Sequence, residues 1–281
     1  MTTAVRTRPA PATKTGPARR TTVLCLVLAP AVVAATVPTV LADGLLRGPA
    51  VMNGSVRGTA LVVLVVALPG LLLALRAAGE GSVRAHAVLV GALAYLTYNA
   101  MLFAYATPFN ELYLAYIVLL ALSLWTLVSA FVDPLPRIDP GPRFPVRGVS
   151  AFLLTVAVLN AAAWLRVDVP ALHQDPPGSL AGTGLTTNPI HVQDLAVWIP
   201  AITIVAVQLW RRRPSGMFLA GAALVFWEIE AVGVAVDQWF GHRAAPTSDV
   251  ATLGGAGLFV AMAALTLLPL TLWLRAAPAR P

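Results

Sequence analysis

The sequence predicts an all-α fold, a polytopic transmembrane helix bundle of about eight spans with both termini in the cytoplasm. Three observations lead to this prediction. Hydrophobic residues make up 58% of the chain and charged residues only 11%, unlike the balance of a soluble domain. Apolar windows recur at about the 20-residue length that a helix needs to cross a bilayer. The basic residues also gather on one side of the topology that these windows define.

Eight windows qualify as spans, and each is bounded by charges, prolines or glycines that end an apolar helix. They cover residues 22–42, 58–75, 87–107, 111–132, 148–165, 191–210, 217–239 and 251–274. The first window follows several Arg residues, as a secretory signal does. Its apolar run of roughly 21 residues is longer than a signal-peptide core of 7 to 15, so we expect a retained helix.

The distribution of basic residues predicts the orientation. With eight spans, 15 of the 19 Lys and Arg residues fall on the side of the two termini. The other 4 are Arg47, Arg57, Arg166 and Arg243. Because cytoplasmic loops retain Lys and Arg, both termini are expected inside. The basic inner face predicts contact with anionic lipids of the bilayer, whereas charge spread over several loops is a poor argument for nucleic acid.

Composition divides the chain into five segments. Residues 1–20 are rich in Thr, Pro and Arg and predict a disordered, basic cytoplasmic tail. Residues 133–147 hold five prolines and predict an extended cytoplasmic linker. The linker separates two four-helix transmembrane halves, 21–132 and 148–275, and residues 276–281 form a second cytoplasmic tail. Because each half starts and ends inside, any internal repeat is expected to be parallel.

The window 217–239 places two acids, Glu228 and Glu230, near the bilayer centre, and no Lys or Arg lies within the apolar windows. An ionised acid is costly there, so the protonated form is the expected resting state. At about 100° per residue, Glu230, Gly233 and Asp237 share one stripe, while Glu228 points about 200° away from Glu230. We therefore expect Glu230 and Asp237 to form the functional face and Glu228 to hydrogen-bond another helix.

The window 87–107 supplies polar partners for these acids. Tyr95, Tyr98 and Asn99 fall largely on one helical face. Phenol and amide groups can donate to a carboxylate or accept from a carboxylic acid. We expect them to join Glu230 in a transport or protonation site, and an ordinary packing contact between polar helix faces is the alternative.

An outer entrance is predicted at the start of the sixth span. Asn188 is suited to cap a helix that begins at the following proline. That start would put His191, Asp194 and Trp198 on one face, and Glu111 belongs to the same side of the membrane.

The same residues allow a second interpretation, a divalent metal held by His191, Asp194 and His242. Imidazole and carboxylate groups bind zinc, copper or iron. No pair here has the spacing of a known metal signature, so a polar rim is favoured over a metal site, and no cofactor is predicted.

Two stretches carry a resemblance, YNAMLFAYATPFNELYLAY at 98–116 and NPIHVQDLAVWIPA at 188–201. They resemble segments of a family of bacterial multi-pass integral membrane proteins that has no established activity. In that family an aromatic and Asn-rich helix pair precedes an Asn-Pro-x-His helix start. The resemblance covers about a third of the chain and implies membrane location without implying any chemistry. The ratio of 18 Arg to 1 Lys also indicates a GC-rich genome, so the expected location is a bacterial cytoplasmic membrane.

The absence of phosphate-loop, catalytic-triad and cysteine-cluster motifs disfavours an enzyme. An acid inside the bilayer with further acids outside favours a small-solute or cation permease, coupled to protons through Glu230. A different class of function is a non-catalytic membrane partner or sensor subunit, whose polar helix faces bind another membrane protein or a second copy. A metal-dependent membrane enzyme is the third hypothesis.

Overall fold

The computed structural model describes residues 16–132, 134–139, 141–213 and 215–278. Within these ranges every regular element is helical, and eight helices are long and apolar enough to cross a membrane. The predicted all-α transmembrane bundle of eight spans is therefore confirmed, and the chain is a multi-pass membrane protein by the length and composition of its helices. The cytoplasmic location of the termini stays a prediction.

Six spans are single helices, and their bounds are α1 (Arg19–Leu41), α4 (Val83–Tyr105), α5 (Tyr113–Val132), α6 (Val146–Ala171), α9 (Gly216–Ala244) and α10 (Leu253–Ala276). The other two spans are composite. One consists of α2 (Ala50–Val62), η1 (Val63–Ala67) and α3 (Leu68–Gly79). The other consists of α7 (Pro189–Gln193), η3 (Asp194–Trp198) and α8 (Ile199–Trp210). A short 3₁₀ turn, η2 (Gly178–Leu180), lies in the loop between α6 and α7.

The second span begins earlier than the sequence predicts, at Ala50 rather than at residue 58. Arg57 therefore lies inside a spanning helix, so the expectation that the spans hold no Lys or Arg is wrong. Its guanidinium donates to the backbone oxygen of Ala42 at 3.1 Å and to Asp43 at 3.2 Å. A long basic side chain near a helix end can reach the membrane surface in this way, which explains how the helix tolerates it.

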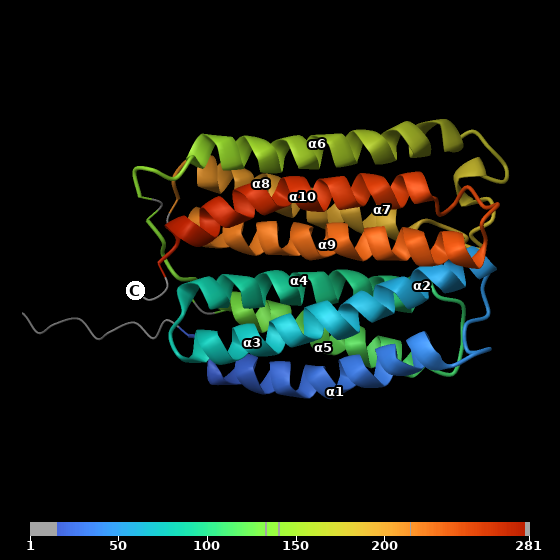
Figure 1. Cartoon of the computed structure of the whole chain (residues 1–281), viewed down its shortest axis with the longest axis horizontal. Coiled ribbons are helices and arrows are strands. Elements are labelled where there is room, and N and C mark those ends of the chain that lie inside the picture. Colours follow the sequence, from blue (N-terminus) through green and yellow to red (C-terminus); the bar gives the residue numbers. More distant parts are fainter. Residues whose placement is uncertain (1–15, 133, 140, 214, 279–281) are drawn as a thin grey trace, which may run out of the picture.

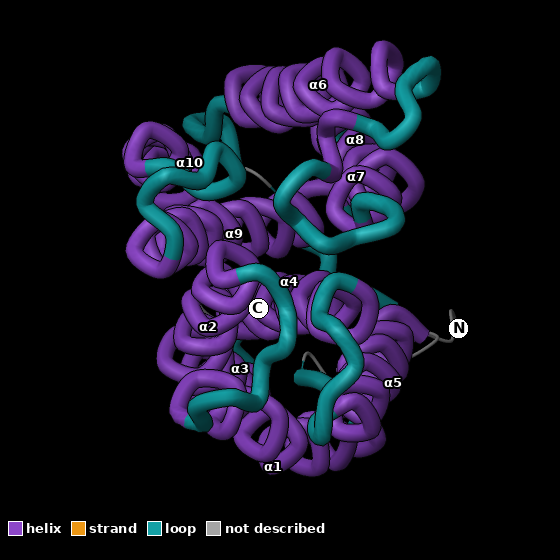
Figure 2. Tube along the Cα trace, turned by 90° about the vertical axis from the view of Figure 1, so that its right-hand side faces the viewer, coloured by secondary structure: helices purple, strands orange, loops and turns teal. Residues whose placement is uncertain are grey.

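Helices α1–α5 lie on one side of the molecule and α6–α10 on the other (Figures 1 and 2). Helix α9 joins them, because it packs against α2 and α4 across the divide as extensively as against α10. The division into two halves therefore stays a prediction. The predicted tail of residues 1–20 falls mostly on residues 1–15, which lie outside the described ranges, as do residues 279–281 of the second tail.

Helix α1 begins and α10 ends at the same end of the bundle (Figure 1). We call it the Arg-rich end, because Arg19, Arg76, Arg147, Arg211 and Arg275 all lie in the helix ends or turns there. The other end is called the opposite end. It is formed by the connections between α1 and α2, α4 and α5, α6 and α7, and α9 and α10.

Two glycines bring the backbones of α2 and α9 into direct contact. A Cβ atom on Gly54 would lie 2.5 Å from the backbone oxygen of Phe240, and one on Gly58 would lie 2.9 Å from the Cα atom of Asp237. Their spacing is the small-xxx-small pattern that lets membrane helices approach closely. This approach places the polar face of α2 beside Asp237.

Both composite spans contain a π-helical turn at the same place relative to a proline. In η1 the N–H of Leu68 donates to Val63 O, and Pro69 follows; in η3 the N–H of Ile199 donates to Asp194 O, and Pro200 follows. Proline has no N–H, and its ring collides with the carbonyl group four residues earlier in a regular helix. A wider turn relieves that collision. The same break thus occurs in the second span of each predicted half.

Candidate functional site

Glu230 lies at the middle of α9 and is 8% exposed. The side chain of Asn99, on α4, interacts with its carboxyl group. One turn further along α9, a Cβ atom on Gly233 would lie 2.7 Å from the hydroxyl oxygen of Tyr95. Gly233 therefore makes room for the Tyr95 side chain, and the two helical faces that the sequence singles out face each other inside the bundle.

Asp237 lies two turns beyond Glu230 on α9 and is partly buried. The hydroxyl groups of Ser55 and Thr59 on α2 interact with its carboxyl group. Both hydroxyls are brought there by the glycine contact between α2 and α9. Hydroxyl donors can hold a carboxylate in a membrane interior where water is absent.

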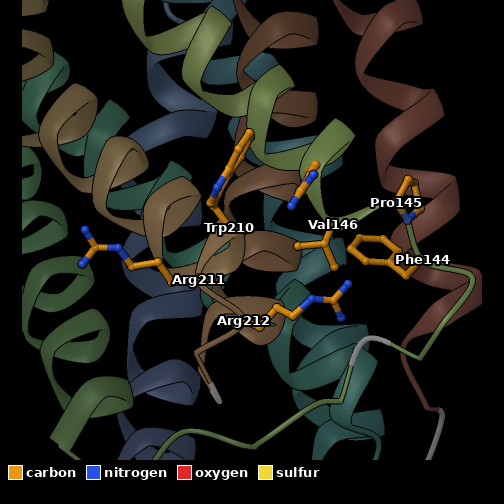
Figure 3. A pocket seen from close by; sticks show the side chains of 7 residues that line it. Phe144, Pro145, Val146, Trp210, Arg211 and Arg212 are labelled. Carbon is orange, nitrogen blue, oxygen red and sulfur yellow. The ribbon is translucent and has the colours of Figure 1, made fainter.

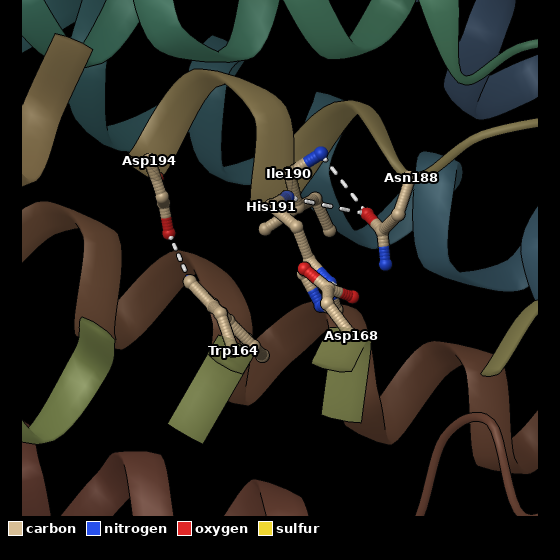
Figure 4. A network of polar contacts seen from close by, with 6 residues as sticks. All are labelled: Trp164, Asp168, Asn188, Ile190, His191 and Asp194. Atoms are coloured by element: carbon tan, nitrogen blue, oxygen red, sulfur yellow. Dashed lines mark hydrogen bonds and ion pairs between the residues drawn. The ribbon is translucent and has the colours of Figure 1, made fainter. Parts of the chain in front are cut away.

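Asp194 is the first residue of η3 and is 5% exposed. Its Oδ2 atom accepts from Trp164 Nε1 of α6 at 2.8 Å (Figure 4). It also accepts from Asn160 Nδ2 of the same helix at 3.4 Å. The hydroxyl group of Tyr98, from α4, is a third polar group that interacts with this carboxyl group. Three donors from two helices therefore surround this carboxyl group.

His191 lies one turn before Asp194 and pairs with Asp168 of α6, with Nδ1 and Oδ1 2.8 Å apart (Figure 4). Its ring stacks on Trp164, with ring centroids 4.2 Å apart and planes 25° apart. Asn188 caps the helix as expected, because its Oδ1 atom accepts from the N–H groups of Ile190 and His191. The cap and the stacked ring fix the position of His191.

The carboxyl groups of Asp194 and Asp237 both lie close enough to Glu230 for the charges to interact. No Lys or Arg of the described ranges forms an ion pair with any of the three. Like charges in a low-dielectric interior repel strongly, so all three cannot be ionised together without a counter-ion. The arrangement therefore favours uptake of protons or of a cation.

An open hollow of about 670 Å³ lies at the opposite end, beside His191 and Asp168. Residues of the connection between α6 and α7, including Gln174, Leu180 and Thr186, form its other wall. The connection therefore borders a hollow between α6 and α7, and His191 and Leu195, on either side of Asp194 in the sequence, line it.

Two residues expected at the entrance lie elsewhere. Trp198 stacks on Phe226 of α9, with centroids 5.1 Å apart, and contacts Tyr98 edge-on. The π turn between Asp194 and Trp198 removes the regular spacing on which the expected shared face depends. Glu111 is exposed and forms an ion pair with Arg47. His191 and Asp168, rather than Trp198 and Glu111, line the hollow at the opposite end.

Two further expectations differ from the structure. Glu228 Oε2 is buried and has no hydrogen-bond partner among the described residues, so this atom does not form the interhelical bond that was expected. Across the described ranges, no three His, Cys, Asp or Glu side chains are grouped closely enough to hold a metal. The proposed trio of His191, Asp194 and His242 is not brought together, because His191 pairs with Asp168 instead.

Sequence reasoning missed the donors on neighbouring helices. Asn160, Trp164 and Asp168 follow one another at four-residue spacing on α6, and this regular polar stripe is a signal that could have identified them. Ser55 and Thr59 were placed outside or at the edge of the second window because that window began too late.

No known protein family, curated protein or solved structure matches the chain. The resemblance of residues 98–116 and 188–201 to bacterial multi-pass proteins therefore carries no family assignment.

Proposed function

We propose that the protein is a permease for a small cation or small solute in a bacterial cytoplasmic membrane, with transport coupled to protons through Glu230. The observation that carries the proposal is that Glu230, inside the bundle, interacts electrostatically with both Asp194 and Asp237, and that none of the three forms an ion pair with a Lys or Arg of the described ranges. Intramembrane acids of this kind mark proton and ion pathways.

A buried carboxyl group couples two events because it accepts either a proton or a cation at the same place. The protonated group is neutral and tolerated in an apolar interior. When it ionises, a bound cation supplies the missing positive charge. Neighbouring carboxyl groups increase the penalty for an unaccompanied negative charge, and so Asp194 and Asp237 strengthen the exchange at Glu230.

The packing supports access from one end at a time. Towards the opposite end, His191 and Asp168 border the hollow and Asp194 lies behind them. Towards the Arg-rich end, α4 and α9 touch, since a Cβ atom on Gly91 would lie 2.5 Å from the backbone oxygen of Ala222. Trp273 of α10 fills the space beside Gly221 and donates to Met217 O at 2.7 Å. Closure at one end with a hollow at the other is the arrangement that alternating access requires.

The partner-subunit hypothesis is less well supported, because the polar face of α4 is already occupied. Tyr95, Tyr98 and Asn99 are buried inside the chain. They contact α9 and η3 rather than presenting a surface to another protein.

Proton flux in liposomes tests the proposal. The purified protein would be reconstituted with a pH-sensitive dye inside, and a proton gradient would be imposed with and without a panel of monovalent and divalent cations and small solutes. Replacing Glu230 by Gln keeps a hydrogen-bonding side chain for Asn99 but removes the titrating group. We expect wild-type protein to move protons, and E230Q to reduce that flux at least about tenfold, which corresponds to about 1.4 kcal/mol.

Glu80→Gln provides a matched control, because Glu80 is exposed at the Arg-rich end and pairs only with Arg76. It should leave the flux unchanged. Glu228→Gln, two residues from Glu230 on the same helix, should have a smaller effect than E230Q. Equal flux for wild type, E230Q and E80Q would refute proton coupling through Glu230.

A further inference from the structure

A second cavity, of about 520 Å³, lies at the Arg-rich end of the bundle, between the start of α6 and the end of α8 (Figure 3). Its walls combine apolar and basic side chains. The residues that matter here are Phe144, Val146, Arg147, Trp210, Arg211 and Arg212. The cavity belongs neither to the acidic cluster nor to the hollow at the opposite end.

The basic side chains of this cavity are those of Arg147, Arg211 and Arg212. No carboxylate in the described ranges forms an ion pair with Arg147, Arg211 or Arg212. The Arg147 guanidinium lies 6.0 Å from the centre of the Trp210 ring. Figure 3 shows the side chain of Arg212 turned towards Val146 and Phe144, while Arg211 extends to the other side. Several unpaired positive charges around one cavity favour a bound anion.

The backbone of Arg212 provides an independent indication that its side chain is needed. Arg212 has φ of 50°, in the left-handed region that favours glycine. It ends α8 in a Schellman turn, in which the N–H of Arg212 donates to Leu209 O and that of Arg213 to Gln208 O, both at 2.9 Å. Glycine is the usual residue at this position. An arginine kept at a strained position suggests a role for its guanidinium.

We propose that this cavity binds the phosphate headgroup of an anionic phospholipid from the leaflet at the Arg-rich end. Phosphate is the shared chemistry of lipid headgroups and soluble phosphate compounds, and bidentate guanidinium groups suit it. Three observations favour the lipid. Helix α6 is among the least buried spans, so the cavity faces the bilayer. Trp210 is 48% exposed at a helix end, where Trp favours the lipid–water boundary. Phe144 and Val146 add an apolar wall.

Native mass spectrometry of the full chain in detergent tests this proposal. The protein would be incubated with equal amounts of phosphatidylglycerol and phosphatidylcholine. We expect at least fivefold more phosphatidylglycerol than phosphatidylcholine to be retained. The double variant R147Q/R212G should bring the two lipids to equal retention. Arg76→Gln is the matched control, because Arg76 lies at the same end but pairs with Glu80, and it should keep the preference.

Two further measurements separate lipid binding from folding and from soluble phosphate. Arg212→Gly alone should keep or raise the unfolding temperature while lowering lipid retention, because glycine adopts φ of 50° without strain. Inorganic phosphate and glycerol 3-phosphate, added in excess, should not displace the lipid. Equal retention of both lipids by wild type, full retention by the double variant, or displacement by soluble phosphate would each overturn the proposal.

Discussion

Two spans of this protein contain the same irregular turn of the backbone and differ in the side chain at its first position. In both spans, Ala50–Gly79 and Pro189–Trp210, a π turn is followed by one residue and then by a proline. The first position of the turn is Val63 in one span and Asp194 in the other. Both are buried, at 1% and 5% exposed. A proline therefore follows the wide turn at the same distance in both spans, whereas the chemistry depends on which side chain occupies the first position of the turn and on which groups of the neighbouring helices contact it.

Placing an acid in η1 should have the largest effect on stability. Val63 packs within the apolar core, so a carboxyl group there would lack the three donors that Asp194 has. We expect Val63→Asp to lower the free energy of unfolding by about 3 kcal/mol. The midpoint of thermal unfolding in detergent would measure it.

The control is Val63→Thr, whose hydroxyl can bond to the preceding turn of its own helix, as that of Thr97 bonds to Leu93 O at 2.8 Å. Its cost should stay below about 1 kcal/mol. If Val63→Asp unfolds at the wild-type temperature, η1 already offers polar surroundings and the two turns do not differ as described.

Removing the acid from η3 should have the largest effect on transport. Asp194→Asn keeps an oxygen that can accept from Trp164 Nε1 but removes the charge. We expect transport in liposomes to fall at least about tenfold, or about 1.4 kcal/mol in activation free energy, with little change in unfolding temperature.

Asp194→Val separates charge from hydrogen bonding. It leaves the N–H of Trp164 without its acceptor, which should cost about 1–3 kcal/mol of stability in addition to the loss of transport. Unchanged transport in both variants would mean that Asp194 takes no part in transport, and that η3, like η1, has only a structural role.

The two prolines should differ in function although they resemble each other in geometry. Pro200→Ala restores an N–H and lets the helix return to a regular turn, which rotates Asp194 away from Trp164. We expect roughly a threefold to tenfold loss of transport, about 1 kcal/mol. Pro69→Ala relaxes the same turn in an apolar segment and should leave transport within about twofold of wild type. Equal losses from both variants would show that the wide turn itself, rather than Asp194, is required.

The smallest expected effect concerns one hydrogen bond. Trp164→Phe keeps an aromatic ring to stack on His191 but removes the donor to Asp194. We expect a loss of about 0.6 kcal/mol in stability, typical of one interhelical hydrogen bond in a membrane. Trp125→Phe is the control, because Trp125 is 63% exposed on α5. Thermal unfolding in detergent compares them, and identical midpoints for the two variants would mean that the Trp164 bond contributes nothing measurable.

Much of the fold could be predicted from the sequence, because hydropathy and length alone identify helices that cross a membrane. All eight windows correspond to helices. The face of Glu230 and Gly233 and the face of Tyr95 and Asn99 could also be predicted, since each depends only on regular spacing along one helix. Wherever a helix is regular, its period places the side chains.

The rest could not be predicted, for two physical reasons. A π turn changes the register of every residue that follows it. Regular helical spacing therefore did not predict the position of Trp198 relative to His191. Pairing between helices also depends on their relative rotation, which hydropathy does not contain. This is why the pairing of His191 with Asp168, and that of Glu111 with Arg47, could not be predicted. Pro69 and Pro200 were the available signal for irregular turns, but the signal is not specific, because Pro30, Pro38 and Pro269 lie inside helices that have no π turn.

The glycine contact between α2 and α9 also has a consequence for biogenesis. Helix α2 leaves the ribosome long before α9, because four other spans are made between them. Until α9 inserts, the surface around Gly54 and Gly58, with the hydroxyl groups of Ser55 and Thr59, has no partner to cover it. Such a surface readily attracts other transmembrane helices. The nascent protein therefore depends on the insertion machinery, or on the surrounding lipids, to keep this face apart from other chains until its own seventh span arrives.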